Sequence, residues 1–146
     1  MSDDIDIGVL AESFTEFLGA EWPREKAVDY VKSNAPFAAD LWAQAGALGW
    51  TALTAGEAHG GLGMGLQSAA ALHEALGVAA APLPLLGSTL ALALLETAGT
   101  PAPCDMLIPG IADSSQRAAT PSPPAAITHP AGPSPARWHA DALRAP

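Results

Sequence analysis

Residues 66–95 read LQSAAALHEALGVAAAPLPLLGSTLALALL, and this stretch decides the fold class. In its first half, apolar residues recur at helical spacing as far as about Ala80, which predicts a helix that ends before Pro82 and Pro84. The second half is apolar on nearly every side, so we expect another helix, closed by Gly99 and buried all round. Because no part of the chain alternates convincingly over the length of a strand, the sequence predicts an all-α multihelical bundle.

Two further helices are predicted upstream of this stretch. The first begins after Asp6, a suitable N-cap, and has apolar residues three and four positions apart: Val9, Leu10, Phe14, Phe17 and Leu18. The second begins at Pro36, capped by Asn34 or Ala35, and ends at Gly49. Its apolar stripe consists of Phe37, Leu41, Ala45 and Leu48.

Charge and cysteine content exclude several functions. The 146 residues carry 15 acidic and 6 basic side chains, a formal net charge of -9, which disfavours a protein that neutralises nucleic-acid phosphates. A single cysteine, Cys104, forms neither an internal disulfide nor a thiolate metal site by itself. The first six residues include three acids and no basic residue, so no targeting segment is recognised and we expect a cytoplasmic protein.

The run 75–95 has no charged side chain, and its 21 residues match the length that crosses a bilayer. Pro82 and Pro84 divide the run into two shorter pieces, and the flanking Glu74 and Glu96 give no positive-inside signal. The sequence therefore favours two packed helices over a membrane span. A small membrane-associated helical protein is kept as an alternative.

The last part of the chain differs in composition from the rest. Half of the 14 prolines lie from Pro121 onward, and no helix or strand period is visible there. Proline fixes φ and removes backbone donors, so we expect a helical domain at 1–118 and a disordered Pro- and Ala-rich tail at 119–146. A frame-shifted remnant of a G+C-rich gene is the favoured origin of this tail, and a genuine disordered segment is the alternative.

Few residues of the chain suggest chemistry. The glycine-rich loop 60–65 lacks the third glycine of a dinucleotide fingerprint and no strand precedes it, so we expect a structural loop rather than a phosphate site. Glu57 and His59 lack a third orienting group, and His73 has no second ligand at helical spacing. These patterns predict no catalytic, cofactor-binding or metal-binding residue.

Several short segments, in this order and at this spacing, nevertheless resemble one family. They are LW…LGWTAL at 41–53, GEAHGGLG at 56–63, ALHEALG at 71–77, APLPL at 81–85 and AGTP…LIPGIA at 98–112. Each is weak alone, but together they resemble the N-terminal helical domain of acyl-CoA dehydrogenases over about 8–118. The resemblance stops where Thr120 to Pro124 replace the apolar strand that begins the middle β-domain in that family.

The resemblance implies a function in fatty acid metabolism. Family members are flavoprotein oxidoreductases that use FAD to oxidise acyl-CoA to 2-enoyl-CoA, with a glutamate of the C-terminal domain as the base. The first helical domain supplies neither the flavin site nor the base and instead helps wall the acyl pocket. By resemblance, Leu86, Thr89 and Leu90 are the expected substrate-binding residues, and no FAD is expected on this chain alone.

Two interpretations of the resemblance stay open. The favoured one is a truncated acyl-CoA dehydrogenase-like protein that is inactive by itself. The alternative is a non-catalytic subunit that docks on a flavin-bearing partner through apolar surface. In either case a domain without its neighbours is expected to expose an apolar face.

Overall fold

The computed structural model describes residues 6–33, 35 and 37–118. In these residues the chain forms six α-helices, two short 3₁₀ helices and no strand. The elements, in chain order, are α1 (Ile7–Glu21), α2 (Arg24–Ser33), α3 (Ala39–Ala47), η1 (Trp50–Ala52), η2 (Glu57–His59), α4 (Gly65–Val78), α5 (Leu85–Ala98) and α6 (Pro101–Ala112). The prediction of an all-α multihelical bundle is confirmed.

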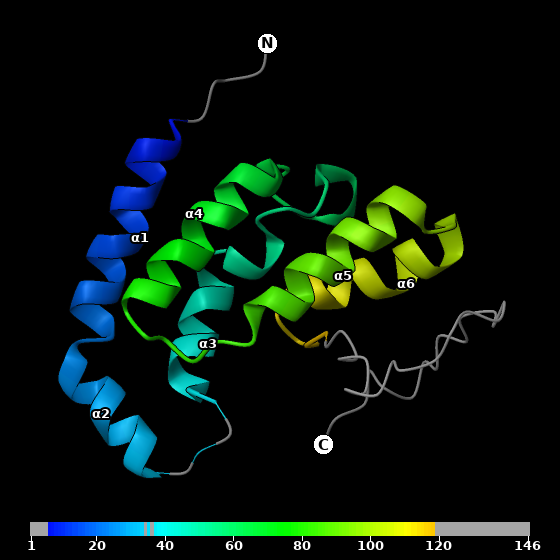
Figure 1. The fold of residues 1–146 in the computed structure, drawn as a ribbon. Helices are drawn as coiled ribbons and strands as arrows, with labels where there is room; N and C mark the ends of the chain where they lie inside the picture. Colours follow the sequence, from blue (N-terminus) through cyan, green and yellow to red (C-terminus); the bar gives the residue numbers. More distant parts are fainter. Residues whose placement is uncertain (1–5, 34, 36, 119–146) are drawn as a thin grey trace, which may run out of the picture.

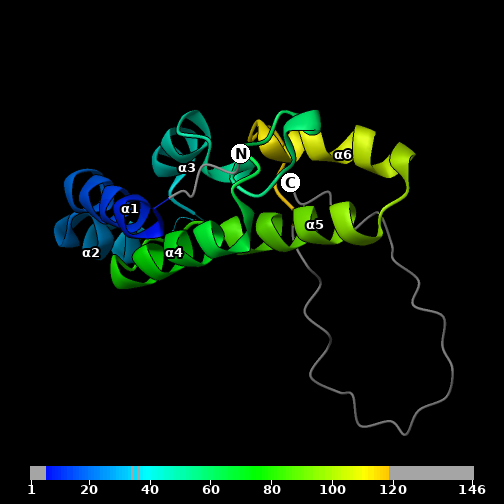
Figure 2. The same ribbon diagram turned by 90° about the horizontal axis from the view of Figure 1, so that it is seen from above.

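The helices lie in two layers, which Figure 2 shows most clearly. One layer holds α4 and α5, which follow one another along the molecule. The other layer holds α3 and α6 (Figures 1 and 2). At one end of the molecule α1 packs along α4, and at the other end α6 packs along α5. The short η1 contacts α3, α5 and α6 and so joins the two ends.

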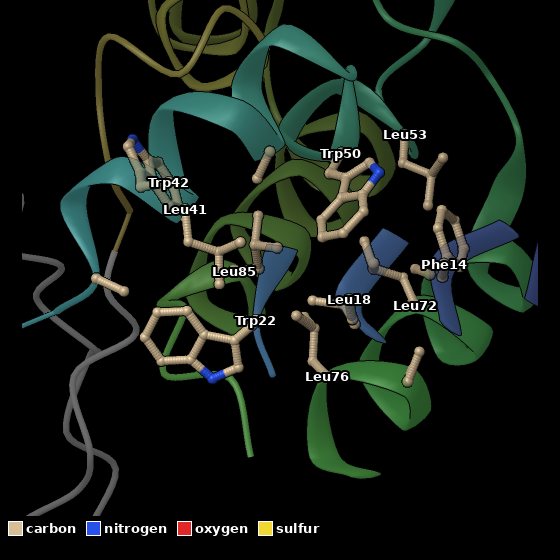
Figure 3. Close-up of a cluster of buried hydrophobic side chains, with 14 residues drawn as sticks. Phe14, Leu18, Trp22, Leu41, Trp42, Trp50, Leu53, Leu72, Leu76 and Leu85 are labelled. Atoms are coloured by element: carbon tan, nitrogen blue, oxygen red, sulfur yellow. The ribbon is translucent and has the colours of Figure 1, made fainter. Parts of the chain in front are cut away.

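The larger hydrophobic core joins α1, α3, η1, α4 and the first residue of α5, Leu85 (Figure 3). Trp22, Trp42 and Trp50 are all buried in it. Phe14 of α1 meets Trp50 edge to face with ring centroids 5.5 Å apart, an arrangement that aromatic pairs prefer. The helix that supplies Phe14 begins where the sequence predicts, because the Asp6 carboxylate accepts a 2.9 Å hydrogen bond from a backbone N–H of the first turn.

A smaller core lies between α5 and α6. Leu92 of α5 is buried there with Ile108 and Ile111 of α6. Ala118 is also buried in this cluster, and its backbone N–H lies 3.4 Å from the hydroxyl oxygen of Ser88 in α5. The described chain thus ends against α5. The predicted disordered tail, 119–146, lies outside the described residues.

The predicted start of α3 is wrong. The helix begins at Ala39 rather than at Pro36, and its N-cap is Ala38, which makes no side-chain hydrogen bond to the helix. Of the residues proposed to start and cap it, Asn34 and Pro36 lie outside the described residues, and Ala35 precedes the helix by several positions. The start therefore rests on the burial of the helix in the core rather than on a side-chain cap.

The sequence patterns do not predict α2 and α6. No side chain of α2 is fully buried, and only Ala27 and Tyr30 pack half-buried against the larger core, which is too short a stripe to reveal the helix. In α6, Pro101 and Pro103 occupy the first turn, where backbone N–H groups have no partner in the helix anyway. Pro109 lies inside the helix, a position where proline usually signals a break.

The expectation that α5 is buried all round is also wrong. Leu85, Ser88 and Leu92 are buried, but Leu86, Leu90 and Leu94 are 57%, 41% and 54% exposed. Because α6 and η1 cover one side of α5, periodicity alone could report its apolar character but not which side is covered. None of the helices in the described part is long and apolar enough to span a bilayer.

Candidate functional site

The predicted substrate-binding residues lie on one face of α5. Leu86, Thr89 and Leu90 are three and four positions apart, so they share a side of the helix, and Leu94 continues the same row. We call Leu86, Leu90 and Leu94 the leucine strip. The Thr89 hydroxyl donates a 3.1 Å hydrogen bond to the backbone carbonyl of Leu85, so it is satisfied within the helix.

The opposite face of α5 fixes the direction of this strip. Ser88 and Leu92 are each 1% exposed, and Leu92 lies in the smaller core with Ile108. A helix held by buried residues on one side cannot rotate about its axis without exposing them, so the leucine strip is held facing outward. The result is a row of aliphatic side chains, with no ionisable group among them, open on the surface of the described chain.

The glycine-rich loop 60–65 serves the backbone. The five N–H groups from Gly60 to Met64 donate to carbonyl oxygens within residues 52–57, over 2.8 to 3.1 Å. Gly60, Gly63 and Gly65 have φ between +61° and +81°, which favours glycine. A Cβ on Gly61 would overlap the carbonyl group of Ala55. These five N–H groups are therefore satisfied by the backbone of the chain itself.

His59 does not pair with Glu57. Its Nε2 lies 3.4 Å from a carboxylate oxygen of Asp105 in α6, and the contact ties η2 to that helix. Beside it, a carboxylate oxygen of Glu96 in α5 accepts a hydrogen bond from the backbone N–H of Gly56. Neither partner is signalled by the sequence pattern, because α6 is not predicted and the packing of α5 against the loop is not predicted either. Both contacts anchor the loop onto α5 and α6.

Each of the remaining candidate side chains has one structural contact, although the Nε2 of His73 is buried with no hydrogen-bond partner among the described residues. His73 makes a 2.7 Å contact from Nδ1 to the carbonyl oxygen of Ala69, one turn earlier in α4. The Cys104 thiol is buried and donates to the carbonyl oxygen of Leu95. Over the described ranges, no three His, Cys, Asp or Glu side chains are grouped as a metal site would need.

One carboxylate has a perturbed acidity. Hydrogen bonds from Ser115, from its side chain and from its backbone N–H at 2.9 Å, lower the pKa of Asp113. Asp113 is the C-cap of α6 and is fully exposed. Its shifted pKa therefore reports a turn that ends a helix rather than a catalytic group in a cleft.

Comparison with known proteins now identifies the fold. A family model described as acyl-CoA dehydrogenase, N-terminal domain, matches residues 8–115, from the first turn of α1 to the turn after α6. The comparisons with curated proteins and with solved structures found no match. The matched segment is about three quarters of the chain and contains the loop, the leucine strip and both cores apart from Ala118. The chain therefore belongs to the acyl-CoA dehydrogenase family, and residues 8–115 are its N-terminal domain.

Proposed function

We propose that this chain supplies the helical wall of the acyl-binding pocket in an acyl-CoA dehydrogenase whose flavin and catalytic base belong to a partner subunit. The wall is the outward face of α5, and Leu86, Thr89 and Leu90 are its substrate-contacting residues. The observation that carries this proposal is the leucine strip, which is held outward and has no cover in the described chain.

The energetics favour a covered strip. Fully burying one leucine side chain contributes about 1.5–3 kcal/mol, and each leucine of the strip is 41% to 57% exposed. Soluble monomers rarely leave a contiguous apolar row of this kind open to water without a use for it. An acyl chain and the apolar surface of a flavin-bearing domain are both surfaces against which such a row can be buried.

The chemistry assigned to this chain is binding and water exclusion. In the family the flavin accepts the hydride removed from the acyl chain. The N–H groups from Gly60 to Met64 are bonded to the chain's own backbone, which supports a structural role for this loop and a flavin held by the partner subunit. The hydroxyl of Thr89 is hydrogen-bonded to the backbone carbonyl of Leu85, so the group that contacts an acyl chain is its methyl group.

Co-purification with a flavin-bearing acyl-CoA dehydrogenase subunit from the same genome tests the proposal. We expect a stoichiometric yellow complex that binds acyl-CoA. Leu90→Lys places a charge in the strip and should weaken the complex or its acyl-CoA binding by more than about tenfold. Val9→Lys is the matched control, because Val9 is an exposed apolar residue on α1.

Two results would contradict the proposal. One is FAD and acyl-CoA oxidation recovered with the purified 146-residue chain alone, which would make the chain a complete enzyme. The other is a complex whose affinity for the partner and for acyl-CoA is the same with Leu90→Lys as with Val9→Lys. In that case the strip would be neither the pocket wall nor the docking surface.

A further inference from the structure

The chain after α6 makes a short crossing from α3 to α5. Residues 114–118, which we call the strap, form the orange end of the described chain in Figure 1. The strap begins against its own helix, where the backbone N–H of Gln116 donates a 2.8 Å hydrogen bond to the carbonyl oxygen of Gly110. It then contacts α3 at one end and α5 at the other, through residues that are distant in the sequence.

Ser114 holds the first end of the strap on α3. Its backbone carbonyl accepts a 3.3 Å hydrogen bond from the indole N–H of Trp42, a buried residue of the larger core. Figure 3 shows the indole nitrogen on the side of the ring away from Leu41. One turn further along α3, a Cβ on Gly46 would overlap the side chain of Ser114. The position of the strap therefore requires a glycine at this point of α3.

Ser114 also has a backbone conformation that serine rarely adopts. Its φ is +64°, in the left-handed region that favours glycine. Residues stay in such conformations only where their surroundings determine them. Here the N–H of Trp42 binds the carbonyl of Ser114, and the N–H of Ser114 donates a 3.2 Å hydrogen bond to the carbonyl of Ile111. The start of the strap is thus set by its contacts rather than by local preference.

The far end of the strap reaches the buried face of α5. Ala118 is 5% exposed, and its backbone N–H lies 3.4 Å from the hydroxyl oxygen of Ser88. Ser88 lies between Leu85, which belongs to the larger core, and Leu92, which belongs to the smaller one. The strap therefore contacts α5 at the point where one core gives way to the other.

Between its two ends the strap has a third contact. The guanidinium of Arg117 lies 4.1 Å from the centre of the Phe37 ring, within the range of a cation–π interaction. Phe37 precedes α3 and packs against the larger core. Because α3 and α5 lie in different layers of the fold, the strap joins the two layers (Figure 2).

We infer that the strap is a positioning element for the leucine strip, which fixes the first half of α5 relative to α3 through Ser114 and Ser88. The inference rests on the proposed function, because the residues that wall the acyl pocket lie within two positions of Ser88 on α5. A displaced strap loosens this part of the helix, whereas the second half remains anchored in the smaller core by Leu92.

Hydrogen exchange of the full 146-residue chain, followed by mass spectrometry, is the first test. Gly46→Ala forces the strap to move, so the amide of Ala118 and those of α5 after Ser88 should exchange at least about tenfold faster, with α1 unchanged. The control is Gly19→Ala, the same substitution inside α1, where no atom lies within 4 Å of the added Cβ. It should leave the exchange of α5 as in the wild type.

A second substitution should reverse the effect. Ser114→Gly removes the side chain that the new Cβ meets and suits the positive φ. Gly46→Ala combined with Ser114→Gly should therefore show α5 exchange within about twofold of that in Ser114→Gly alone. A double variant that exchanges as fast as Gly46→Ala would overturn the inference, as would a faster strap beside an unchanged α5.

Circular dichroism establishes that each variant is folded. If Gly46→Ala is not, Ser88→Ala removes the contact at the other end of the strap and replaces it in the comparison. The same two outcomes then apply: faster exchange of α5 after residue 88 supports the inference, and unchanged exchange overturns it.

Binding of octanoyl-CoA by the complex with the flavin-bearing subunit tests the effect on the leucine strip. Gly46→Ala should raise the dissociation constant at least about fivefold, and the double variant should restore it. An unchanged constant in a variant whose α5 exchanges faster would overturn the positioning role. If the wild-type chain forms no such complex, the proposed function fails, while exchange in the isolated chain still decides whether the strap holds α5.

Discussion

The hydroxyl of Thr51 donates a 2.8 Å hydrogen bond to the backbone carbonyl of Ala112, and both residues are buried. The bond joins η1 to the last turn of α6, which are 61 residues apart in the sequence. A helix leaves its last carbonyl groups without partners inside the helix, so this hydroxyl satisfies a group that burial would otherwise leave unpaired. Through it, the two cores of the domain share one polar anchor.

Thr51→Val should therefore destabilise the domain by about 1–3 kcal/mol, since it keeps the shape of the side chain and removes the donor to a buried carbonyl. Urea unfolding followed by circular dichroism measures the change. Thr97→Val is the control, because Thr97 is exposed and bonds only within its own helix. Equal stability of the two variants would show that the carbonyl of Ala112 finds another partner.

Gly61→Ala should prevent the glycine-rich loop from closing. The new Cβ would overlap the backbone carbonyl of Ala55, and neither backbone can move without losing the hydrogen bonds of the loop. We expect a loss of more than about 2 kcal/mol of unfolding free energy, as for other strained buried sites.

Gly77→Ala provides the comparison for this variant. Gly77 lies in α4 with open space around its Cα, so alanine there should stabilise the chain by about 0.5–1 kcal/mol. The two substitutions are chemically identical. A lower Tm for Gly61→Ala and a higher Tm for Gly77→Ala would separate the effect of a close backbone contact from that of helix propensity. A Gly61→Ala protein as stable as the wild type would show that the loop can accommodate a Cβ at this position, contrary to the overlap with Ala55 in the structure.

The sequence predicts those elements whose burial is periodic. α1 and α4 each bury one stripe of side chains, and the spacing of that stripe reports the helix directly. α2 escapes prediction because only Ala27 and Tyr30 pack on the core, and both are half-buried. α6 escapes prediction because the prolines tolerated in its first turn resemble helix breakers. Local sequence patterns thus predict a helix where its buried residues recur at helical spacing and where prolines lie outside it, and they fail where either condition is not met.

The candidate site was predictable only in part. That Leu86, Thr89 and Leu90 share a face follows from helical geometry, but their exposure depends on which side of α5 is covered by α6. The contact of Ser114 with Gly46 likewise depends on how the chain after α6 crosses α3. Contacts between distant segments set both features, and a single sequence does not encode them in any local spacing.

Asp113 gives the turn after α6 a dependence on pH. Its pKa is lowered in the folded chain by hydrogen bonds from Ser115, so the folded state favours the ionised carboxylate. The stabilisation is present above the pKa of Asp113 in the unfolded chain, about 3.9, and is lost as the pH falls through the lower pKa of Asp113 in the folded chain. Comparing Tm between pH 5 and pH 2 should show a smaller decrease for Asp113→Asn than for the wild type. Equal decreases would contradict the linkage.

The two faces of α5 should respond oppositely to truncation. Leu92 is 1% exposed in the smaller core, so Leu92→Ala should cost about 2–5 kcal/mol of unfolding free energy. Leu90 is 41% exposed, and Leu90→Ala should change stability by less than about 1 kcal/mol while weakening the flavin-bearing complex. Unfolding and partner binding measured on the same pair of variants separate the fold from the function. If Leu90→Ala instead unfolded the isolated chain as readily as Leu92→Ala, the leucine strip would belong to the core, and the pocket wall proposed for this domain would have to lie on another helix.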